Sequence, residues 1–132
     1  MEELSPNMNP EQVNQISMLG LAHIGDAVYE LLVRARLCTA GHKAVLDLHR
    51  STVALVNAPA QAKAMTRILP LLTAEETAVF KRGRNAKVHS VPQHAELAEY
   101  HAATGLEALF GWLYLQGKTA RIGELFTAVM EE

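Results

Sequence analysis

Two carboxylates stand out because each interrupts an apolar helical stretch that also contains glycine. Asp26 follows Gly25 in the run LAHIGDAVYELLVRARL, and Glu107 lies in EYHAATGLEALFGWLYL, which carries two glycines of its own. Burial of an unpaired carboxylate is costly, and an interior glycine costs roughly 1 kcal/mol relative to alanine. Glycines do let a second backbone or a ligand come close. Two helices packed along these stretches would bring Asp26 and Glu107 together, and paired carboxylates suit Mg²⁺.

A basic run supplies a second chemical feature. KRGRNAK, Lys81 to Lys87, holds four of the twelve lysines and arginines of a chain whose net charge is −2. Such a run is typical of a surface that contacts phosphates, and equally of a solvated helix end. A metal held by two acids beside a phosphate-binding run favours metal-assisted hydrolysis of a phosphodiester. The plainer alternative for Asp26 is an ion pair with an arginine or lysine that the sequence does not identify.

Other polar residues near the acids have structural explanations. Glu30 precedes Arg34 by four residues, the favourable order for a helical ion pair, so we expect a structural or supporting role rather than a catalytic one. Tyr100 and Tyr114 are candidate supporting donors, although such tyrosines are more often simply packed. His23 is expected in a core or an interface. The six histidines form no HxxxH pair of the kind that binds metal.

Composition places these residues in a small globular protein. The 132 residues are 49% apolar and 20% charged, so we expect a single domain over 1–132. No run approaches the ~18 apolar residues of a membrane-spanning helix, so no membrane partner is expected. The start, MEELSPNMNPEQ, is acidic and polar, unlike a signal peptide, and predicts a cytoplasmic location. Cys38, the one cysteine, is expected to be a small core residue at a helix end.

Periodicity and capping residues predict an all-α chain of about seven helices. Asn9 and Thr73 each begin a predicted capping box, with Gln12 and Glu76 three residues later. The predicted helices start at Pro10 and then cover about 19–37, 44–56, 58–68, 74 to the basic run, 93–115 and 120–130, with a loop at 87–92. On a helical wheel, the predicted core face of the second helix comprises Leu21, Ile24, Val28, Leu31, Leu32 and Ala35. Asp26 lies nearly opposite, among further apolar residues, so that face is also expected to be covered.

These motifs resemble the RNase III nuclease domain, and more closely its small bacterial subfamily, Mini-III. LGLAHIGDAV is similar to the signature helix of the family, approximately ExxEFLGDAV, at the glycine, Asp26 and the following Ala-Val. TGLEALFGWLY is similar to the second motif, DxxEAxxGxxY, and contains Glu107. The basic run and the order of helices look like Mini-III, and the resemblance covers nearly the whole chain. At two positions where the larger family has acidic residues, this chain has Ala22 and Thr104. Mini-III enzymes resemble this chain in having fewer acidic residues.

The resemblance implies an endonuclease that cuts double-stranded RNA to leave 5′-phosphate and 3′-hydroxyl ends. It implies Mg²⁺, with Mn²⁺ as a substitute, bound by Asp26 and Glu107, with Thr104 in a supporting role. It also implies a homodimer whose catalytic valley follows the two-fold axis, which would cover the Asp26 face. Mini-III enzymes mature the ends of precursor 23S ribosomal RNA, helped by a large-subunit ribosomal protein.

The expected single domain determines which part of the protein binds RNA. With no separate RNA-binding domain expected within 132 residues, the nuclease domain itself must grip the RNA through phosphates and 2′-hydroxyls. The candidates are Arg82, Arg84, Asn85 and Lys87. Two rival interpretations stay open. One is a non-catalytic RNA-binding ribosome-assembly factor on the same dimeric fold. The other is a purely structural helical dimer in which both acids pair with basic residues.

Overall fold

The chain folds into a set of α-helices. The computed structural model describes residues 4–41, 44–87 and 96–131. Within these ranges there is no strand, and the all-α prediction with seven α-helices is confirmed. Residues 88–92 of the predicted loop and residues 93–95 of the predicted sixth helix lie outside them. The helices are α1 (Pro10–Val13), α2 (Met18–Thr39), α3 (Val45–Val56), α4 (Ala58–Ile68), α5 (Ala74–Arg84), α6 (Leu97–Leu115) and α7 (Thr119–Met130), with a 3-10 turn η1 (Leu69–Leu71) after α4.

Side-chain caps explain where several helices begin. The predicted capping boxes are both present, one between Asn9 and Gln12 and one between Thr73 and Glu76. In the second, Glu76 N donates to Thr73 Oγ1 over 3.1 Å, and Thr73 N donates to Glu76 Oε1 over 2.9 Å. Asn57 caps α4 by accepting from Ala60 N over 2.9 Å. These bonds satisfy backbone N–H groups that have no partner inside the first turn.

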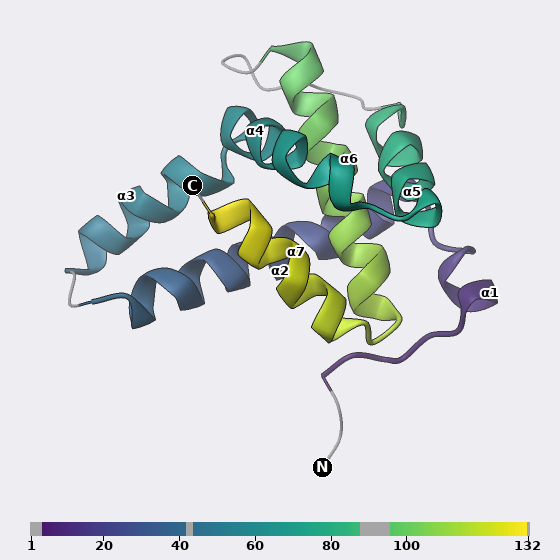
Figure 1. Cartoon of the computed structure of the whole chain (residues 1–132), viewed down its shortest axis with the longest axis horizontal. Helices are drawn as coiled ribbons and strands as arrows, with labels where there is room; N and C mark the ends of the chain where they lie inside the picture. Colours follow the sequence, from purple (N-terminus) through teal and green to yellow (C-terminus); the bar gives the residue numbers. More distant parts are fainter. Residues whose placement is uncertain (1–3, 42–43, 88–95, 132) are drawn as a thin grey trace.

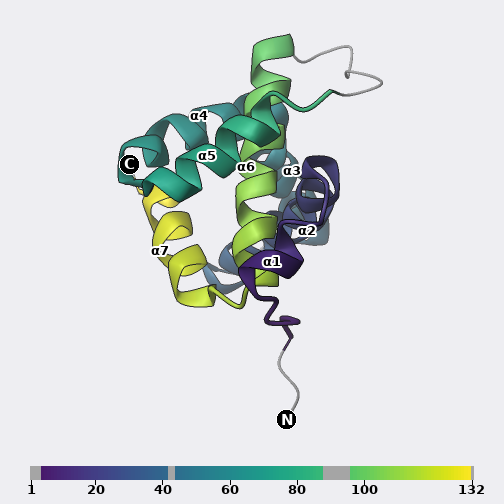
Figure 2. The ribbon, with the colours of Figure 1, turned by 90° about the vertical axis from the view of Figure 1, so that its right-hand side faces the viewer.

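Helix α6 forms the centre of the molecule. Helices α2, α4, α5 and α7 all pack against it, as Figures 1 and 2 show from two sides. Between Ala103 and Leu113 every residue of α6 is buried except Glu107, which is partly exposed. A helix that is apolar on all sides belongs inside a bundle. The carboxylate therefore marks a place where the core opens toward solvent.

The predicted core face of α2 is wrong in part. Its buried residues are Leu21, Ala22, Gly25, Tyr29 and Val33. Leu31, predicted to be buried, is 64% exposed, and Ala35, also predicted to be buried, is exposed as well. Apolar residues occur on two sides of this helix, so periodicity alone does not select the side that faces α6. The Tyr29 ring instead lies edge-on to Phe110 and Phe126, with centroids 5.3 and 5.8 Å away.

The second half of α2 and α3 form an arm that extends from the body (Figure 1). Cys38 lies at the end of α2 on this arm. It is exposed, so the prediction of a core cysteine is wrong. The reason is the length of α2, which carries its last turn beyond the bundle and leaves only α3 beside it. No described helix is long and apolar enough to cross a membrane.

An ion pair joins α5 to α7. Glu76 is buried and receives two bonds from Arg121, from Nε over 2.9 Å and from Nη2 over 2.8 Å. Arg121 Nη2 also donates to the Leu71 carbonyl over 2.8 Å. The hydrogen bonds from Arg121 lower the pKa of Glu76, despite an opposing contribution from burial. The paired geometry keeps this buried carboxylate ionised and ties α7 to the rest of the bundle.

Candidate active site

Asp26 and Glu107 meet where α2 crosses α6. A Cβ on Gly25 would lie 1.6 Å from the Glu107 carbonyl oxygen, and one on Gly111 would lie 2.0 Å from the Leu21 carbonyl oxygen. Only glycine at both positions lets the two backbones touch. Asp26 comes directly after Gly25, and its side chain is in hydrogen-bonding contact with that of Glu107. The expectation that the two acids come together is therefore confirmed as geometry.

The pairing perturbs Glu107 strongly. Burial, the negative charge of Asp26 and a hydrogen bond to Asp26 together raise the pKa of Glu107 to about 8, and Gln61 acts in the opposite direction. Without a cation, the Glu107 carboxyl therefore favours its protonated form at neutral pH. A carboxyl held neutral by a second acid beside it is a recurrent feature of functional sites.

This shift predicts how stability depends on pH. In the unfolded chain Glu107 titrates near 4.5, and in the metal-free folded protein near 8. Between these values the folded state holds more protons, so this group makes the free energy of unfolding fall as pH rises. Urea unfolding at several pH values should show the decline in wild type and not in Glu107→Gln, which cannot ionise. Identical pH dependence in the two proteins would contradict the assignment, and the exposed Glu124→Gln serves as control.

The donor set fits a hard divalent cation. Mg²⁺ is commonly held by one or two carboxylates, with waters and substrate phosphates completing its octahedron. The Asp26–Glu107 pair supplies that number at the rim of the core. No group of three or more His, Cys, Asp or Glu side chains suited to a metal occurs in the part of the chain that the structure describes. Among the described residues, the two acids are therefore the carboxylate ligands that this site offers.

The predicted supporting residues lie in different environments. Glu30 forms the expected pair with Arg34, at 2.6 Å, beside Asp26 on α2. Thr104 is buried one turn before Glu107, and its hydroxyl donates to the Tyr100 carbonyl over 3.0 Å. Tyr100 is half-buried near the start of α6. The Tyr114 hydroxyl donates to the Leu4 carbonyl over 2.5 Å, which ties it to the N-terminal segment.

The basic run lies at the end of α5, next to α6. A Cβ on Gly83 would lie 2.7 Å from Ala108 Cβ and 3.1 Å from Gly105 Cα, so α5 also crosses α6 closely, within one turn of Glu107. Arg82, Asn85 and Lys87 are exposed, and Arg84 is partly exposed. None of the three cations among them forms an ion pair within the described ranges. Their charges remain available to an anionic partner.

Gln61 on α4 was not predicted as a site residue. This side chain lies beside Glu107 and is only 2% exposed, and its Nε2 has no hydrogen bond of full geometry among the described residues. The buried face of α4 comprises Gln61, Ala64, Met65 and Ile68, an i, i+3, i+4, i+7 series. The sequence signal for this residue is a glutamine at one position of an otherwise apolar i, i+3, i+4, i+7 series, which predicts a buried polar side chain.

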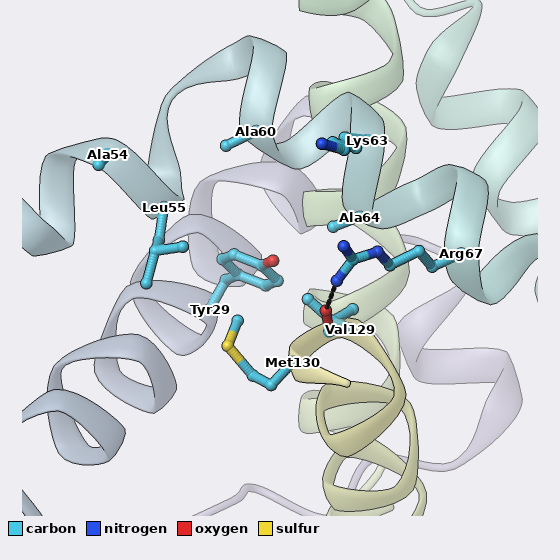
Figure 3. Close-up of a pocket in the computed structure, with 9 residues that line it drawn as sticks. All are labelled: Tyr29, Ala54, Leu55, Ala60, Lys63, Ala64, Arg67, Val129 and Met130. Atoms are coloured by element: carbon cyan, nitrogen blue, oxygen red, sulfur yellow. Dashed lines mark hydrogen bonds between the residues drawn. The ribbon is translucent and has the colours of Figure 1, made fainter. Parts of the chain in front are cut away.

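A hollow of about 390 Å³ lies along another side of α4, between it, α3 and the end of α7 (Figure 3). Tyr29, Lys63 and Arg67 line it, and neither acid does. The Arg67 guanidinium is directed at the end of α7, where Nη1 donates to the carbonyls of Val129 and Glu131 over 2.7 and 2.8 Å. Arg67 thus caps a helix, and the hollow has no part in the chemistry of the acid pair.

Comparison with known proteins agrees with this geometry. The Ribonuclease III domain family matches residues 19–118. A Mini-ribonuclease 3 of Symbiobacterium thermophilum is 48% identical over 113 residues, 86% of this chain and 87% of that protein. A Mini-ribonuclease 3 of a Thermoanaerobacter species is 43% identical over 128 residues, 95% and 90% of the two chains.

The fold agrees as well. A crystal structure of a protein from Fusobacterium nucleatum matches with a TM-score of 0.79 at 32% identity, over 86% of this chain and 87% of that one. The matched region includes α2 and α6, which carry the two acids, and α5, which carries the basic run. The chain belongs to the ribonuclease III domain family.

Proposed function

We propose that this chain is a metal-dependent endoribonuclease that hydrolyses phosphodiester bonds in double-stranded RNA. The observation that carries the proposal is the contact between Asp26 and Glu107 at the α2–α6 crossing, inside two motifs of a nuclease family. A structural role for the acids would require basic partners. No ion pair involves either acid in the described structure, which argues against that alternative.

Asp26 and Glu107 would hold Mg²⁺, for which Mn²⁺ can substitute. Bound there, the ion would activate water and stabilise the negative charge that develops on the scissile phosphate and the leaving oxygen. The chain itself supplies the two carboxylates, which must both be ionised to bind the cation. It also supplies the rigid crossing that fixes their separation, since Gly25 and Gly111 leave the helices no room to shift toward each other.

The test is cleavage of a perfectly paired RNA. We expect products with 5′-phosphate and 3′-hydroxyl ends in Mg²⁺ or Mn²⁺, and none in a chelator. Single-stranded RNA of the same sequence should stay intact. A protein that binds the duplex and never cuts it in either ion would instead be the non-catalytic assembly factor.

We further propose that residues 1–132 act as one nuclease domain that grips RNA directly, through Arg82, Arg84, Asn85 and Lys87. Arg82→Ala with Arg84→Ala should weaken duplex binding and flatten its salt dependence by about one unit of slope for each lost phosphate contact. Binding measured over a range of salt checks this. Lys118→Ala, beyond the end of α6, is the control and should keep the wild-type slope. An unchanged slope in the double variant would make the run a solvated helix end.

The natural substrate belongs to this proposal too. We propose precursor 23S ribosomal RNA in the cytoplasm as the substrate, with a large-subunit ribosomal protein as helper, because the family resemblance of the two acidic motifs implies them. A transcript carrying the paired ends of that precursor should be cut at defined positions. Cleavage of an unrelated duplex at equal rate, with or without the ribosomal protein, would favour a general nuclease.

A homodimer would cover the apolar surface that the bundle leaves open. Large apolar side chains are exposed on α2 and α3, at Leu19, Leu31, Val45, Leu46 and Val53. Large apolar side chains exposed on neighbouring helices are typical of association surfaces. Sedimentation should give a dimer for wild type and a shift toward monomer for Leu31→Glu. A monomeric wild-type protein at assay concentrations would contradict this part of the proposal.

A further inference from the structure

Gln61 is an unexpected residue for its position. It lies in the first turns of α4, on the face that packs against α6, among the apolar residues Ala64, Met65 and Ile68. At 2% exposure the residue is almost fully removed from water. Leucine or methionine would fill such a site without a polar group to satisfy. The amide must therefore have a partner in the working state of the protein.

In the metal-free chain, the hydrogen bond from the Gln61 amide to such a partner is not fully formed. Gln61 Nε2 is buried and has no hydrogen bond of full geometry in the described residues. The same side chain is nevertheless in contact with Glu107. Every other described side-chain nitrogen or oxygen atom that is equally buried, apart from His101 Nδ1, has a hydrogen-bond partner. The orphaned donor thus lies against one of the two carboxylates of the site.

We propose that Gln61 is a positioning residue for the metal site, whose Nε2 donates to the Glu107 carboxylate and holds it facing Asp26. This inference rests on the proposed function of the acid pair. A metal ligand usually needs an outer hydrogen bond that fixes its orientation. Asp26 is exposed and has solvent to provide that bond, whereas Glu107 projects from the all-buried stretch of α6. Gln61 is the donor that the fold places beside it.

An amide suits this position better than a charged donor. A lysine or arginine would neutralise Glu107 and compete with the cation for it. The glutamine N–H orients the carboxylate and leaves its negative charge for the metal. The backbone supports this placement, because Asn57 caps α4 and Gln61 N donates to the Asn57 carbonyl over 3.0 Å.

Gln61→Met tests the inference, since methionine has a similar volume and no hydrogen-bonding group. Binding of Mn²⁺ to the protein without RNA, followed by electron paramagnetic resonance, should weaken roughly 10- to 100-fold. The thermal midpoint should stay level or rise, because the variant removes a buried donor that lacks a partner. Thr52→Val is the matched control. It replaces another buried polar side chain, whose hydroxyl donates only to the Leu48 carbonyl, and should leave Mn²⁺ binding unchanged.

The outcomes separate this inference from the proposed function. The positioning role is wrong if Gln61→Met binds Mn²⁺ as tightly as wild type does. It is also wrong if the variant loses Mn²⁺ binding only because it unfolds. A wild-type protein that binds no Mn²⁺ through Asp26 would overturn it too, because Gln61 would then have no ligand to orient. Failure of the wild-type protein to cut duplex RNA, with the Mn²⁺ results as expected, overturns only the proposed function.

Discussion

Replacing Asp26 with asparagine or Glu107 with glutamine should lower metal-dependent cleavage of double-stranded RNA by roughly a thousandfold or more in kcat/KM. Each substitution keeps the shape of the side chain and removes a charge that the divalent cation needs. The loss corresponds to about 4 kcal/mol of transition-state stabilisation, within the several kcal/mol that a catalytic metal contributes. Single-turnover cleavage of a labelled duplex, over a range of Mg²⁺ concentrations, measures the effect.

Fold stability distinguishes this loss from unfolding. Glu107→Gln should be at least as stable as wild type at neutral pH without metal, because it removes an acid whose ionised form is disfavoured beside Asp26. Duplex binding should persist in both variants, since the basic run is unchanged. Glu124→Gln, an exposed acid of α7, should retain full cleavage. Full activity in Asp26→Asn would remove the acid pair from the mechanism even if the fold and the RNA-binding surface were correct.

A site with two acids leaves metal binding by the free protein to a small set of ligands, so the orientation of each ligand should matter. The resemblance places Ala22 and Thr104 where larger nucleases of the family have further acids. Both residues are buried here, and the Thr104 hydroxyl is bonded within its own helix. Water and phosphate oxygens must therefore fill more of the coordination shell. This is the physical reason to measure Mn²⁺ binding directly when testing residues around the pair.

The sequence indicated the acids, but not how they meet. Each carboxylate was recognisable because it interrupts an apolar helix beside glycine. Their contact depends on a crossing between residues more than eighty positions apart in the chain, which no local pattern encodes. Gly25 and Gly111 show that small residues were the informative signal, because each marks a point where backbone touches backbone.

Helix ends were more predictable than helix faces. The predicted capping boxes at Asn9 and Thr73 are local interactions, and the structure shows both. The buried side of α2 is decided instead by what packs on it. With apolar residues on two sides, Leu31 was assigned to the core and is exposed.

Gln61 was missed for a different reason. A polar residue in a helix is normally predicted to face solvent. One glutamine among apolar residues hardly changes the hydrophobic pattern of the helix. Its meaning depends on α4 packing against α6 next to Glu107, which only the structure supplies.

Replacing Gly25 with alanine should destabilise the protein by roughly 3 kcal/mol or more. Alanine is the better helix former by about 1 kcal/mol, so propensity alone predicts a gain. The new methyl group would lie 1.6 Å from the Glu107 carbonyl oxygen, 2.6 Å from the Glu107 carbonyl carbon and 2.8 Å from Gly111 N. These are backbone atoms of the central helix and cannot rotate away, so α2 and α6 must separate. Overpacking of this severity outweighs the gain in propensity. Urea unfolding measures the difference.

Gly123→Ala is the matched control, because it makes the same change in a helix where nothing lies within 4 Å of the added Cβ. It should stabilise the protein by about 0.5–1 kcal/mol. Stability changes of opposite sign in the two variants would separate the effect of the helix crossing from that of helix propensity. Gly25→Ala should also lose cleavage where it still folds, because a shift of about 1 Å between catalytic groups can cost a hundredfold in rate. If Gly25→Ala unfolds at the wild-type urea concentration and still cuts RNA, the two backbones are not in contact, and the acids would have to be held together by some other feature of the fold.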